Sequence, residues 1–98
     1  MTRRNRDTND LRAFEARLNI TWAGQNGDLS YPVPFDASDR QLKDMAIEAV
    51  RGGSVPGVNA DRFMNLDGFV VDRFQASHAT PYNRIFVRPK TPFGEPTP

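Results

Sequence analysis

One segment of the chain has the sequence features of a complete amphipathic helix, and it restricts what the rest can build. In DASDRQLKDMAIEAVRGG, Ser38 is placed as an N-cap, and Gln41 three residues later completes a capping box. The apolar residues that follow recur at the spacing of one helix face: Leu42, Met45, Ala46, Ala49 and Val50. The glycine pair 52–53 supplies a left-handed stop. The pattern predicts one helix that packs on a sheet, with Asp39 and Lys43 spaced for an i,i+4 ion pair.

Two stretches of alternating polarity precede this helix. The first has apolar residues at Leu18, Ile20 and Trp22, the period of a half-buried strand. A tight turn is expected at residues 26–27, Asn-Gly. The second has apolar residues at Leu29, Tyr31, Val33 and Phe35. Because Pro32 and Pro34 cannot donate to a central ladder, the second strand is predicted at a sheet edge with both prolines facing outward.

Further strands are expected after the helix. RFMNL, the Asp67-Gly68 turn and FVV predict a short hairpin. Residues 72–84 are predicted to be an irregular polar loop, and residues 85–87, Ile-Phe-Val, a buried closing strand. Trp22 and Tyr31 are expected in the core, and exposure of either would make the sheet face a docking patch.

The order of these elements indicates the fold class. Strand pairs interrupted by one helix predict an α+β domain with a mixed four- to five-stranded sheet and the helix packed on one face. A last strand parallel to the first leaves the second strand at the edge. We expect a disordered polar arm at 1–16, the domain at 17–88 and an extended tail at 89–98.

With that architecture, residues 17–94 resemble the ubiquitin-like β-grasp family. The segments that carry the resemblance are RLNITWAGQNGDLSYPVPF, SDRQLKDMAIEAVRGG, RFMNLDG and IFVRPKTPFG. The nearest kind is the small bacterial ubiquitin-like modifiers, some of which carry residues beyond the terminal glycine that a protease removes. The resemblance implies that cleavage between Gly94 and Glu95 removes EPTP and that Gly94 is then joined to target proteins. The chain has Phe93-Gly94 where the family has a double glycine, so it fits the sulfur-carrier variant less well.

The tail residues suit such a role. Glycine has no Cβ, so nucleotide and nucleophile can approach an activated Gly94 carbonyl closely. Pro92 favours an extended tail, and Phe93 suits an apolar pocket beside the reaction centre. Arg88 and Lys90 are expected to steer toward an acidic enzyme surface. The implied partners are an activating (adenylating) enzyme, a conjugating enzyme, a processing protease and target proteins, and the chain itself supplies no catalytic group.

Two other functions stay open. One is a β-grasp adaptor or assembly subunit that binds protein partners through its sheet face or edge and is never conjugated. The other, weaker one is an RNA-contacting module that uses the arginine-rich first residues. The net charge of +1 argues against a dedicated nucleic-acid surface.

The sequence gives little support to an enzyme. His78 is the only histidine, no cysteine is present, and no phosphate loop or nucleophile elbow is recognisable. We therefore expect no catalytic residue, metal site or cofactor. No apolar stretch is long enough for a membrane span, and we expect a cytoplasmic protein.

Overall fold

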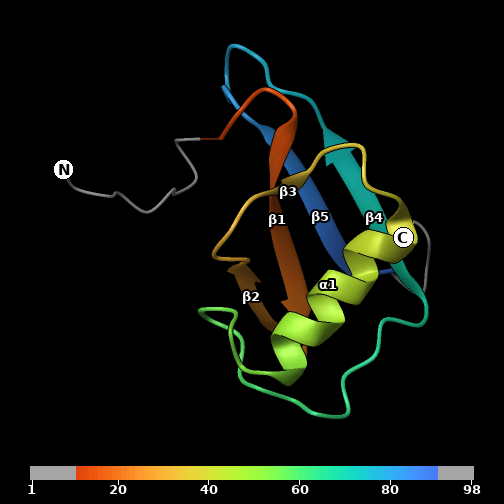
Figure 1. The fold of residues 1–98 in the computed structure, drawn as a ribbon. Helices are drawn as coiled ribbons and strands as arrows, with labels where there is room; N and C mark the ends of the chain where they lie inside the picture. Colours follow the sequence, from red (N-terminus) through yellow and green to blue (C-terminus); the bar gives the residue numbers. More distant parts are fainter. Residues whose placement is uncertain (1–10, 91–98) are drawn as a thin grey trace, which may run out of the picture.

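The structure is a computed structural model, and it describes residues 11–90. These residues form an α+β fold with a mixed five-stranded sheet and a single helix on one face, an arrangement compatible with a β-grasp-like fold (Figure 1). The elements in chain order are β1 (Glu15–Trp22), β2 (Gln25–Asp28), β3 (Val33–Pro34), α1 (Asp39–Arg51), β4 (Phe69–Phe74) and β5 (Asn83–Pro89).

The sheet is built around β1 and β5. Its strand order is β2-β1-β5-β4, and β3 also pairs with β1, beyond the end of β2. β1 and β5 run parallel, while the other pairings are antiparallel. The last strand is therefore parallel to the first, the arrangement that leaves the second strand at the edge. β1 starts at Glu15, so the end of the predicted polar arm belongs to the first strand.

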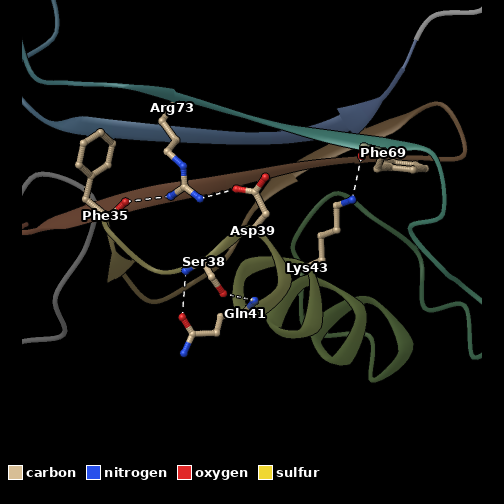
Figure 2. A network of polar contacts seen from close by, with 7 residues as sticks. All are labelled: Phe35, Ser38, Asp39, Gln41, Lys43, Phe69 and Arg73. Carbon is tan, nitrogen blue, oxygen red and sulfur yellow. Dashed lines mark hydrogen bonds and ion pairs between the residues drawn. The ribbon is translucent and has the colours of Figure 1, made fainter.

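Helix α1 forms as its sequence predicts. The Ser38 Oγ accepts from the Gln41 backbone N–H at 3.0 Å, and the Gln41 side chain accepts from the Ser38 N–H at 2.9 Å (Figure 2). Gly53 has a φ of 74°, the left-handed conformation expected after the helix. The predicted stripe faces the sheet, with Leu42, Ala46, Ala49 and Val50 buried.

The predicted ion pair between Asp39 and Lys43 is wrong. Asp39 instead pairs with Arg73 of β4 at 2.5 Å, and the Lys43 Nζ donates to the Phe69 carbonyl at 2.8 Å (Figure 2). Arg73 also donates to the Phe35 carbonyl at 2.9 Å. Spacing along a helix does not predict partners on a neighbouring strand. Here Asp39 and Lys43 each attach the start of α1 to β4.

The first turn is also displaced from its predicted position. Ala23 and Gly24 connect β1 to β2, with φ angles of 52° and 78°, and positive φ at both positions is what a type I′ hairpin requires. Asn26 and Gly27 lie within β2. Gly27 is needed for close packing, because a Cβ there would lie 2.1 Å from the Pro56 carbonyl oxygen.

The second strand is interrupted. β2 and β3 both lie at the outer edge of β1, as predicted, but a bend at residues 30–31 separates them. Tyr31 is 49% exposed, so its expected place in the core is wrong. Pro34 lies in β3 and is exposed, which agrees with an outward-facing proline at an edge.

No strand forms at residues 62–66. Within this segment, Phe63 and Asn65 lie in local turns: the Phe63 N–H donates to the Asp61 carboxylate at 3.0 Å, and the Asn65 side chain accepts from the Asp67 N–H at 3.1 Å. Such side-chain bonds to the backbone compete with a strand ladder. Met64 and Leu66 are nevertheless buried, so the segment covers the core as a loop.

The core lies between α1 and one face of the sheet. The side chains of Leu18, Ile20, Ile85 and Val87 that point toward the helix are fully buried. Trp22 packs against this core, and its Nε1 donates to the Asp61 carboxylate at 3.0 Å. Helix α1 lies on this side of the sheet, and no helix within residues 11–90 covers the opposite face (Figure 1).

Candidate functional site

The predicted conjugation site lies outside the described residues. Gly94, Glu95, Pro92 and Phe93 are beyond residue 90, so their predicted roles stay predictions. The two other tail residues are described. The Arg88 Nε donates to the Asp72 carboxylate at 2.8 Å, and Lys90 is exposed, with its backbone N–H donating to the Gly68 carbonyl at 3.2 Å.

The uncovered face of the sheet, called the open face below, carries the side chains that alternate with the core. Odd-numbered residues of β1 and even-numbered residues of β4 and β5 point to it, since successive side chains of a strand point to opposite faces. Its central members are Arg17, Asn19, Val70, Asp72, Phe74, Arg84, Phe86 and Arg88. This face is therefore mainly polar and aromatic, whereas the centre of the covered face is aliphatic.

Four of these residues and the adjacent Tyr82, which precedes β5, form an arginine–aromatic cluster: Arg17, Phe74, Tyr82, Arg84 and Phe86. The guanidinium carbon of Arg84 lies 5.2 Å from the ring centre of Phe74 and 5.7 Å from that of Phe86. The two phenylalanine rings meet edge to face with centres 5.6 Å apart. Arg17 lies 4.5 Å above the ring of Tyr82. Each contact has the geometry of a favourable cation–π or aromatic pair.

The two arginines of the cluster differ in their ionic partners. Arg17 and Arg84 are register partners on the parallel strands β1 and β5. Arg17 lies 3.4 Å from the Asp28 carboxylate. Arg84 has no carboxylate partner within residues 11–90. In the same part of the chain, the Nε atoms of both arginines are buried and have no hydrogen-bond acceptor.

Polar contacts hold the margins of the open face. The Asn19 side chain donates to Asp28 at 2.7 Å and exchanges hydrogen bonds with Asn26 on the β2 side. Arg88 and Asp72 pair on the β4 side. Asp28 and Asp72 therefore flank the cluster with negative charge.

Sequence reasoning missed this cluster. The signal was present in the alternation of Arg84, Phe86 and Arg88 with Ile85 and Val87. The apolar run at 85–87 was instead interpreted as a strand buried on both faces. Phe74 and Tyr82 fell in a segment predicted to be an irregular loop, although β4 extends to Phe74.

Other parts of the described chain offer less chemistry. His78 is exposed in the loop between β4 and β5. Within residues 11–90, no three acidic, histidine or cysteine side chains are grouped to hold a metal ion. A shallow hollow of about 500 Å³ lies between the start of α1 and loop 65–68, and it is lined by Asp39, Lys43 and other residues of both charges.

The remaining findings concern membranes and known proteins. In residues 11–90, α1 is too short to cross a membrane. No protein-family model, curated protein or solved structure matches the chain.

Proposed function

We propose that the chain is a cytoplasmic ubiquitin-like protein modifier, matured by removal of residues 95–98 and conjugated through Gly94. In this proposal an activating enzyme joins the Gly94 carboxylate to AMP, using ATP and releasing pyrophosphate. AMP leaves when the acyl group is transferred. With a conjugating enzyme, the acyl group reaches an amine of a target protein, and an isopeptide bond forms. All catalytic groups belong to these partner enzymes.

The position of β5 is the observation that supports this proposal. β5 lies between β1 and β4 and pairs with both, so the chain reaches Pro89 from the centre of the sheet. Lys90 is held by its bond to Gly68. Because β5 is already ordered, little conformational entropy is lost in this strand when an enzyme binds the tail that follows it.

Two truncated chains test the proposal in the native host. A chain that ends at Gly94 is expected to form covalent adducts without the processing protease, because its acyl donor is already free. A chain that ends at Phe93 is expected to form none. Intact-mass analysis of the recovered protein distinguishes these results. Equal adduct formation by both chains, or none by either while the full chain is also unmodified, overturns the proposal.

A second candidate is an adaptor that binds protein partners through the sheet and is never conjugated. The arginine–aromatic cluster favours it, since aromatic residues and arginine are enriched among the residues that dominate binding energy at protein interfaces. Under this function the chain that ends at Phe93 works as well as the full chain.

A further inference from the structure

The cluster is arranged around a positive charge that the described protein leaves unpaired. Arg84 is half-buried, and its guanidinium lies over the rings of Phe74 and Phe86. It has no carboxylate partner in residues 11–90. Its register partner Arg17 adds a second positive charge on the same face. A partly desolvated guanidinium beside a like charge gains from an added anion more than a solvated surface arginine does.

An apolar surface adjoins that charge. Phe74 is 46% exposed, and its edge-to-face contact with Phe86 and its stacking with Arg84 hold it in place. A rigid aromatic ring loses little side-chain freedom when a partner covers it. The site therefore combines one unpaired cation with one pre-positioned apolar contact.

We propose that this cluster binds an acidic segment of a protein partner. A carboxylate of the partner pairs with the Arg84 guanidinium, and an adjacent apolar side chain packs on Phe74. The guanidinium fork suits a carboxylate, which accepts two parallel hydrogen bonds from it. Arg17 contributes charge to the same site and keeps its contact with Asp28.

The surroundings favour a carboxylate on a peptide over a nucleic-acid strand. Glu15, Asp28 and Asp72 point to the same face and repel a continuous line of phosphates. A single carboxylate at Arg84 does not meet this obstacle.

This inference deepens the adaptor function and is compatible with conjugation, because the cluster and Gly94 are separate sites. The two can fail independently. The chain that ends at Phe93 is expected to keep peptide binding, and an Arg84→Gln chain is expected to keep adduct formation in the host.

Nuclear magnetic resonance of the full chain tests the site directly. The probe is a short peptide with one glutamate flanked by leucines, and its control replaces that glutamate with glutamine. We expect the acidic peptide to shift the side-chain Nε–H signals of Arg84 and Arg17 and the ring signals of Phe74. The glutamine peptide is expected to leave them in place. No shift at these groups up to millimolar acidic peptide overturns the proposal.

Matched variants then separate the site from general charge. Arg84→Gln is expected to weaken binding of the acidic peptide about tenfold, the loss of one charge-assisted hydrogen-bonded pair. Arg62→Gln is the control, because Arg62 also lies over an aromatic ring, Phe63, at 5.6 Å but outside the open face. Equal effects of the two substitutions contradict the assignment.

Tighter binding of oligo(dT) than of the acidic peptide shows a nucleic-acid surface and also overturns the proposal. Arg84→Lys, with unchanged folding by circular dichroism, provides a second variant and is expected to bind between wild type and Arg84→Gln.

Discussion

Strand β5 has two faces that differ in burial and in the chemistry of their side chains. Ile85 and Val87 point toward α1, are fully buried and belong to the apolar core. Arg84 and Phe86 alternate with them in sequence, point the other way and contact a partly exposed ring, Phe74. The covered face supplies the apolar core, while the open face is ordered by cation–π and aromatic contacts.

This difference separates what the fold needs from what it offers. Burial of aliphatic side chains contributes most of the folding free energy, and exposed cation–π contacts contribute about 0.5–1 kcal/mol each. We expect substitutions on the covered side to lower stability strongly and those on the open face to lower it weakly.

The largest effect is expected where the covered side continues onto β2. Gly27 is the register partner of core residue Ile20, and loop residue Pro56 lies against it. Gly27→Ala places a Cβ 2.1 Å from the Pro56 carbonyl oxygen, so the loop must move. We expect a loss of about 3 kcal/mol in the free energy of unfolding, measured by urea denaturation.

Gly24→Ala is the matched control in the same hairpin. Nothing lies within 4 Å of a Cβ at Gly24, and only its φ of 78° opposes the substitution. The expected loss is about 1 kcal/mol, the cost of a left-handed non-glycine residue. If the two glycine variants are equally stable, close packing of loop 52–68 on β2 is not what Gly27 provides.

How far the sequence predicted these two faces depends on the range of the interactions. The capping box of α1 and its apolar stripe were correct, because both involve neighbours a few residues apart. The order of elements allowed β5 to be parallel to β1, and the structure shows this pairing. Burial of the helix stripe and of Leu18 and Ile20 was predictable from periodicity, but the same periodicity wrongly placed Tyr31 in the core.

The errors have a different origin. The turn at Ala23-Gly24 was missed because Asn26-Gly27 is a stronger local turn signal, but Gly27 is used for contact with Pro56. The Asp39 partner and the open-face cluster depend on which residues of separate strands lie side by side. Register brings Arg17 beside Arg84 and Phe74 beside Arg84, and no local pattern fixes it.

An intermediate effect on the free energy of unfolding is expected when a valine is replaced by alanine on each of the two faces. Val87→Ala removes two buried methyl groups from the covered face, and Val70→Ala removes them from the half-buried open face of the neighbouring strand. We expect a loss of about 2 kcal/mol for Val87→Ala and less than about 1 kcal/mol for Val70→Ala, by the same urea titration. Similar losses at both positions contradict the division of the sheet into a structural and an open face.

The smallest effect is expected from the ion pair at the margin of the open face. Arg88 and Asp72 pair across β4 and β5, with side chains that are 48% and 33% exposed. Because solvent screens such a pair, a double-mutant cycle with Arg88→Ala and Asp72→Ala is expected to give a coupling of about 0.5 kcal/mol that declines in high salt. The cycle also bears on Arg88 as a tail residue. A coupling that is absent at every salt concentration leaves Arg88 free to meet a partner enzyme, whereas the expected value means that such a partner must compete with Asp72 for it.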